Sequence, residues 1–166
     1  MRNSDVRRGA ASGAEVDDYA PAATRLLIAF IAGFIAVPVF HQSLLALFAA
    51  IGAVSAAPFS SEPAAVTGLP QVVSRALLGG VYGIALVILL ERIVRHRSGP
   101  AFWTTAVGIG ALLPSVVAWF IIEPIKGQPL ASGGDPTQIG VALATNAAWG
   151  GGTAAIYSFV RRLRLV

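Results

Sequence analysis

The sequence predicts an all-α fold, a polytopic transmembrane four-helix bundle. Four long apolar runs lie at residues 26–48, 72–90, 101–122 and 139–160. Each run reaches or approaches the ~20 residues that a helix needs to cross the hydrocarbon core of a bilayer. The chain of 166 residues is 55% hydrophobic and only 12% charged, whereas soluble domains carry about 25% charged residues. A soluble fold of this length is too small to bury four such runs away from water.

The basic residues predict the orientation of the bundle. Ten of the twelve Arg and Lys residues lie on one side of the runs, and the other side holds only Arg75 and Lys126. Because cytoplasmic segments carry an excess of Arg and Lys, we expect both termini in the cytoplasm. An even number of spans places both ends on one side, so four spans agree with the charge distribution. In a bacterial cell the protein would lie in the inner (plasma) membrane. The ten residues are Arg2, Arg7, Arg8, Arg25, Arg92, Arg95, Arg97, Arg161, Arg162 and Arg164.

The first run follows a polar segment and contains a proline. Residues 1–23 are polar and rich in Gly and Ala, which is typical of a flexible cytoplasmic tail. Residues 24–166 are expected to form a single transmembrane domain. Pro38 predicts a kink inside the first span, because proline lacks an N–H and clashes with the preceding turn. The loop at residues 57–70 contains three prolines, which exclude a long helix there.

The later runs are joined by short connections. Residues 98–100, Ser-Gly-Pro, predict a tight cytoplasmic turn between the second and third runs. The third run contains Pro114 and has aromatic residues near both ends, as in the belts at membrane interfaces. Residues 75–80 and 146–151 each place a polar residue four positions before a glycine pair. This similarity indicates that the bundle consists of two duplicated helical hairpins.

Glycines in the second and fourth runs predict close packing of helices. Small residues let helix backbones approach each other where lipid provides no hydrophobic driving force. Two interpretations are open, namely packing within one chain and an interface between copies of the chain. The candidate packing residues are Gly79, Gly83, Gly150 and Gly151.

Each run also contains a polar residue at a similar depth. A rise of 1.5 Å per residue places these residues roughly 21–25 Å from the cytoplasmic ends of their helices, in the outer third of the bilayer. Polar groups inside a membrane are costly, and they commonly mark functional sites. The candidate polar layer comprises His41, Gln42, Arg75, Ser115 and Asn146.

Arg75 is the costliest member of the polar layer. Its side chain can extend to the membrane surface without a partner, pair with a carboxylate of an outer loop, or contribute to a vestibule that binds a small anion. The candidate outer-loop ion-pair residues are Glu62, Glu123 and Lys126.

The sequence contains no pattern typical of catalytic chemistry. It has no Cys and two His, which excludes thiolate ligands and a His-rich metal site. No spacing matches a phosphate-binding loop or a dinucleotide fingerprint. We therefore expect a protein that is not an enzyme and that has no cofactor, metal or nucleic-acid partner. The expected partners are the lipid bilayer and either other membrane subunits or further copies of the chain.

Four short blocks occur in an order found in a known family. They lie at residues 30–42, 68–74, 124–129 and 146–150. On these blocks the chain resembles an uncharacterised family of small bacterial four-span integral membrane proteins. The resemblance covers residues from about 25 to 155, and it implies four spans but no activity. Leu77 and Leu78 depart from the aromatic pair that the resemblance leads us to expect.

Two functions are compatible with these observations. The first is a non-enzymatic scaffold or accessory subunit of a membrane complex, which the short loops favour. The second is a small oligomeric transporter or channel with a polar vestibule near the outer face. Subunits that co-purify would favour the first, and a fixed homo-oligomer would favour the second.

Overall fold

The computed structural model confirms the all-α prediction. It describes residues 21–94 and 99–163. In these ranges the elements are α1 (Ala22–Ala36), η1 (Val37–His41), α2 (Gln42–Ala50), α3 (Gln71–Ile93), α4 (Pro100–Val117), η2 (Ala118–Ile122), α5 (Glu123–Ile125), η3 (Leu130–Gly134) and α6 (Pro136–Arg162). η1 and η2 are π-helical turns and η3 is a 3-10 turn.

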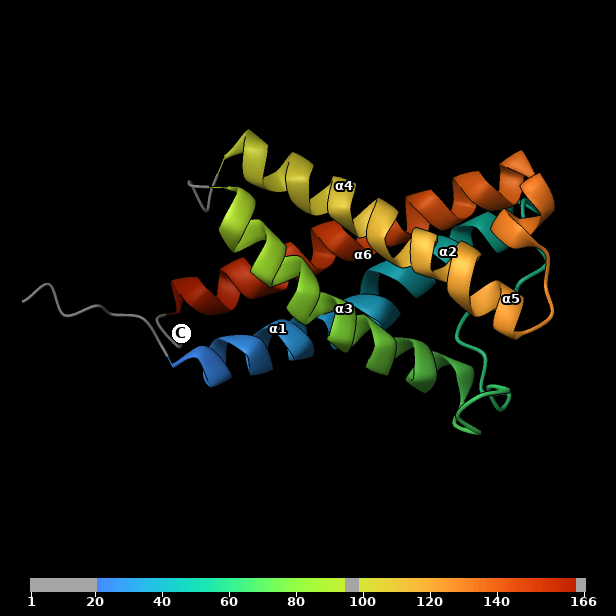
Figure 1. The fold of residues 1–166 in the computed structure, drawn as a ribbon, viewed down its shortest axis with the longest axis horizontal. Coiled ribbons are helices and arrows are strands. Elements are labelled where there is room, and N and C mark those ends of the chain that lie inside the picture. The colour runs from blue at the N-terminus through green and yellow to red at the C-terminus, as the bar shows by residue number, and fades with distance from the viewer. Residues whose placement is uncertain (1–20, 95–98, 164–166) are drawn as a thin grey trace, which may run out of the picture.

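The elements form four long helical rods (Figure 1). The first rod joins α1, η1 and α2, the second is α3, the third joins α4, η2 and α5, and the fourth is α6. Residues 51–70 and 126–135 lie at one end of the bundle, which we call the loop end. The start of α1, the end of α3, the start of α4 and the end of α6 lie at the other end, the terminal end. Each predicted span falls within one rod.

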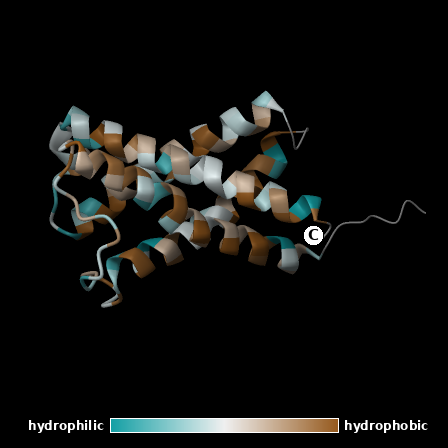
Figure 2. Ribbon diagram, turned by 180° about the vertical axis from the view of Figure 1, so that it is seen from behind, coloured by the Kyte–Doolittle hydropathy of each residue, from teal (hydrophilic) through white to brown (hydrophobic). Residues whose placement is uncertain are grey.

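Three of the four rods in the described part of the chain are long and apolar enough to cross a membrane, namely Ala22–Ala50, Gln71–Ile93 and Pro100–Ile125. α6 has the length but a more polar composition, which differs from the predicted fourth apolar span. α6 contacts α1, α2, α3 and α4, and it buries Thr145, Gly150 and Thr153 against them. A helix that lies among other helices can carry small and polar residues on its contact faces. Hydrophilic residues are more frequent towards the two ends of the bundle (Figure 2).

The first rod differs from the prediction at its start and agrees at its proline. α1 begins at Ala22, so it includes two residues assigned to the tail, and residues 1–20 lie outside the described ranges. Pro38 lies in η1, where the Gln42 N–H bonds to the carbonyl of Val37, five residues earlier. A proline ring clashes with the carbonyl four residues before it, and a widened turn relieves such a clash. The predicted kink is therefore a π-helical turn.

Glycines bring α1 and α3 into backbone contact. A Cβ atom on Gly33 would collide with the carbonyl oxygen of Gly79, and one on Gly83 would lie 2.5 Å from the carbonyl oxygen of Ala29. Only hydrogen fits at these positions. The predicted packing residues Gly79 and Gly83 therefore hold two helices of one chain together, and Gly33 is their partner on α1.

α4 and α6 make a similar contact. A Cβ atom on Gly110 would lie 2.5 Å from the Cα of Gly150, and one on Gly150 would lie 2.6 Å from the carbonyl oxygen of Ala106. A Cβ atom on Gly151 would meet its nearest neighbour at 3.4 Å, which is an ordinary contact. Gly150 is thus required for this packing, whereas Gly151 is not.

The two hairpins repeat one contact in a different register from the predicted duplication. In the first hairpin, the α1 glycine approaches the carbonyl of Gly79 and the Cα of Gly83. In the second, the α4 glycine approaches the carbonyl of Asn146 and the Cα of Gly150. Asn146 therefore corresponds to Gly79, and Gly150 to Gly83. The predicted alignment of the two polar-glycine stretches is wrong by one helical turn, because it matched residue types and not the positions that touch the neighbouring helix.

Replacing Gly110 with alanine should lower the midpoint of thermal unfolding in detergent. The added methyl group meets backbone atoms of α6, and such overpacking costs about 1–3 kcal/mol. Gly108 on the same helix is the matched control, because nothing lies within 4 Å of a Cβ atom there. Gly108→Ala should leave the midpoint unchanged or raise it, since alanine favours a helix by up to about 1 kcal/mol over glycine. Equal shifts for the two variants would contradict the proposed contact.

Candidate functional site

A cavity of about 360 Å³ lies near the loop end and has walls from all four rods. α3 diverges from the third rod towards this end (Figure 1). We call the space the loop-end cavity. Five of the predicted polar residues line it, although they come from separate parts of the sequence: His41, Arg75, Glu123, Lys126 and Asn146.

Arg75 lies near the start of α3, on the wall of the loop-end cavity, and is partly buried. Its guanidinium donates a hydrogen bond to Oε1 of Gln71 on the same helix, at 3.3 Å. The predicted ion pair of Arg75 with Glu62 or Glu123 is absent, because neither carboxylate of these two described residues lies within 4.0 Å of the guanidinium. The charge of Arg75 therefore borders the cavity without a carboxylate partner from the described chain.

Backbone and hydroxyl groups of the loops explain why the predicted ion pair does not form. Oε2 of Glu123 accepts the N–H of Ser132 at 2.9 Å, and Oε1 accepts the Ser132 hydroxyl at 3.2 Å. Glu62 is exposed in its loop, and its main-chain carbonyl accepts the N–H of Gln71 at 2.9 Å. Lys126 is exposed at the end of α5 and forms no ion pair with another described residue.

Gln42 is a structural member of the predicted polar layer and does not line the loop-end cavity. It is fully buried, and its Oε1 accepts the N–H of Phe59 at 3.0 Å. Phe59 has a φ of 53°, in the left-handed region that non-glycine residues seldom adopt. The hydrogen bond therefore holds the loop at residues 51–70 against the bundle.

Ser115 and Asn146 join α4 to α6. Nδ2 of Asn146 donates to Oγ of Ser115 at 2.9 Å, and that hydroxyl donates to the carbonyl of Ala111 at 2.6 Å. Asn146 lines the loop-end cavity, whereas Ser115 is fully buried behind it. The predicted layer is thus divided into residues that border the cavity and residues that support its walls.

Trp149 lies next to the predicted polar layer in the sequence but was not among its members, and it lines the same cavity. Its indole N–H donates to the carbonyl of Gly33 at 2.9 Å, and its ring meets Tyr82 edge-on with centroids 6.3 Å apart. The available signal was a tryptophan close to Asn146 and directly before three glycines, because such glycines mark a place where a helix approaches its neighbours closely.

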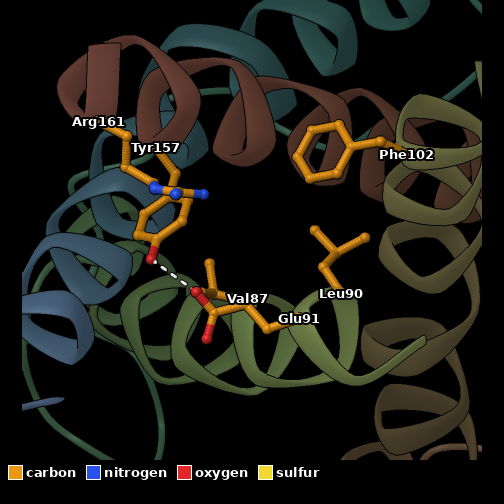
Figure 3. A pocket seen from close by; sticks show the side chains of 6 residues that line it. All are labelled: Val87, Leu90, Glu91, Phe102, Tyr157 and Arg161. Carbon is orange, nitrogen blue, oxygen red and sulfur yellow. Dashed lines mark hydrogen bonds between the residues drawn. The ribbon is translucent and has the colours of Figure 1, made fainter. Parts of the chain in front are cut away.

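A second cluster, also missed, lies at the terminal end. Nη1 of Arg25 donates to Oε2 of Glu91 at 3.1 Å, and the hydroxyl of Tyr157 donates to Oε1 at 3.2 Å. The Arg161 guanidinium lies 5.9 Å from the centre of the Tyr157 ring (Figure 3). The cavity beside these residues measures only about 10 Å³, roughly the space of one water molecule. The cluster therefore ties α1, α3 and α6 together and leaves no room for a ligand.

The loop-end cavity combines apolar walls with a few charged and polar side chains. No three His, Cys, Asp or Glu residues lie close enough to hold a metal ion in the part of the chain that the structure describes. Comparisons with models of protein families, with curated proteins and with solved structures found no match to this chain. The resemblance to the four-span membrane family therefore stays a prediction.

Replacing Gln42 with leucine should destabilise the protein and loosen the loop at residues 51–70. The substitution removes the acceptor of the partly buried hydrogen bond from the Phe59 N–H, and losing such a bond costs about 0.5–1.5 kcal/mol. Thermal unfolding and amide hydrogen exchange of the loop measure the two effects. Gln128→Leu is the control, because the Gln128 side chain is exposed. Unchanged exchange at residue 59 in the Gln42 variant would show that the hydrogen bond does not hold the loop.

Proposed function

We propose that this chain is a multi-pass protein of the bacterial inner membrane, with four spans and both termini in the cytoplasm. The three apolar rods and the shielded position of α6 support four spans. Arg25, Arg92 and Arg161 lie at the terminal end of the bundle. The excess of basic residues on cytoplasmic segments supports placing this end in the cytoplasm.

We further propose that the protein binds a ligand in the loop-end cavity, as a receptor-like or transporter component without enzymatic activity. The single observation that carries this proposal is the cavity itself, which gathers charged and polar residues from separate rods. Burying an Arg at the centre of a membrane costs about 2.5–3.5 kcal/mol, and less near its surface. Arg75 borders the cavity without a carboxylate partner from a described residue, which favours the vestibule over the purely structural role.

Cysteine labelling tests both the cavity and the orientation. The chain has no Cys, so a single introduced thiol is the only reactive one. Leu78 lines the cavity, whereas the neighbouring Leu77 does not, although both are substantially exposed. A membrane-impermeant maleimide added to spheroplasts should modify Leu78→Cys but not Leu77→Cys, because water reaches the cavity while lipid covers the other face.

Two further variants complete this experiment. Val66→Cys in the exposed loop should react from outside, and Ile93→Cys at the terminal end should react only after permeabilisation. Reaction of Ile93→Cys in intact spheroplasts would reverse the proposed orientation. Protection of Leu78→Cys while Val66→Cys reacts would contradict an open vestibule.

A further inference from the structure

We propose that the loop-end cavity binds an anionic amphiphile, a molecule with an oxyanion head and an apolar tail, and that Arg75 is the main contact for the head. This inference rests on the proposed function, because the ligand must reach the cavity from the outer half of the membrane. Three features of the cavity support it, namely a cation without a carboxylate partner among the described residues, the balance of charge and the apolar walls.

Arg75 is the cation that lacks a carboxylate partner among the described residues. A guanidinium has five N–H donors in a planar fork that matches two oxygens of a phosphate or carboxylate. The structure uses one terminal nitrogen, in the 3.3 Å bond to Gln71, and no described carboxylate pairs with the group. Donors therefore remain for an oxyanion, and partial burial strengthens such a contact relative to one in bulk water.

The balance of charge around the cavity also favours an anion. Three of its lining residues carry a formal charge at neutral pH: the cations Arg75 and Lys126 and the anion Glu123. Both oxygens of Glu123 already accept hydrogen bonds from Ser132, which disperses its charge. His41 and Asn146 add groups that can hydrogen-bond a polar head.

The walls favour an amphiphile over a free inorganic anion. Leu45, Ile122 and Val141 line the cavity together with Trp119. A volume of about 360 Å³ is at the lower end of the ~300–1,000 Å³ typical of ligand sites, so a head and the first part of a tail fit. Leu78 lines the cavity and is 46% exposed. The cavity therefore reaches the surface at α3, and the rest of a tail can leave there towards lipid while water enters the cavity from the loop end.

Tryptophan fluorescence of the purified full-length protein in a neutral detergent tests the inference. Of the three Trp residues, Trp119 and Trp149 line the cavity, and a Trp103→Phe background removes the third, which lies at the terminal end. The probes are a short-chain phosphatidylglycerol, the phosphatidylcholine of equal acyl length, and inorganic phosphate. Phosphatidylglycerol should bind at least ~10-fold more tightly than either of the others, as a charge-assisted contact implies.

Substitutions at Arg75 and Lys126 test whether this preference for phosphatidylglycerol comes from the proposed contact. Arg75→Gln should remove the preference without lowering the thermal midpoint, because Arg75 forms no ion pair with a described residue. Lys126→Gln, at an exposed position, should reduce the preference partly and gives a second test if the Arg75 variant does not fold. Arg92→Gln, exposed at the other end of the bundle, should keep the wild-type preference.

The outcomes separate this inference from the proposed function. Equal binding of the two lipids, or an unchanged preference in Arg75→Gln, overturns the anion assignment. In that case the vestibule stands if Leu78→Cys is still labelled. Inorganic phosphate that binds as tightly as phosphatidylglycerol overturns the role of the tail. No fluorescence change with any probe, together with protection of Leu78→Cys, overturns the vestibule as well.

Discussion

Backbone contact at glycines is the constraint on which the rest of this structure depends. Gly33 meets Gly79 and Gly83 in the first hairpin, and Gly110 meets Gly150 in the second. Between helices in lipid, association relies on close van der Waals packing, because the tails are as apolar as the side chains. Each hairpin is therefore held where its glycines touch. α3 and the third rod can diverge towards the loop end, and the cavity occupies the space between them.

Trp149 couples the two hairpins through the same glycines. Its indole N–H reaches the carbonyl of Gly33 on the opposite hairpin at 2.9 Å. A Cβ atom on Gly79 would lie 2.9 Å from that oxygen and 3.2 Å from the indole nitrogen. Glycine at position 79 thus leaves room both for α1 and for the hydrogen bond. Gly79 and Trp149 also line the loop-end cavity, so the contacts that assemble the bundle define one wall of the site.

The four long helices could be predicted from the sequence, because each apolar run has about the length that a helix needs to cross a bilayer. The constant rise of a helix puts His41, Arg75 and Asn146 at one level along their helices, and all three line the same cavity. The contact partners were not predictable. Gly33 is a lone glycine in the first run, and its spacing does not reveal which glycines of α3 it meets. The path of the second loop decides that Ser132, and not an arginine, reaches Glu123.

Partly buried charges have different partners at the two ends of the bundle, and this difference bears on the role of Arg75. At the terminal end, Arg25 pairs with Glu91, which also accepts the Tyr157 hydroxyl. The fold therefore provides a carboxylate where a charge serves to join helices. At the loop end the nearby acid, Glu123, is turned to its own loop, and Arg75 keeps its charge beside a cavity. This contrast supports the ligand from outside the chain that we propose as the partner of Arg75.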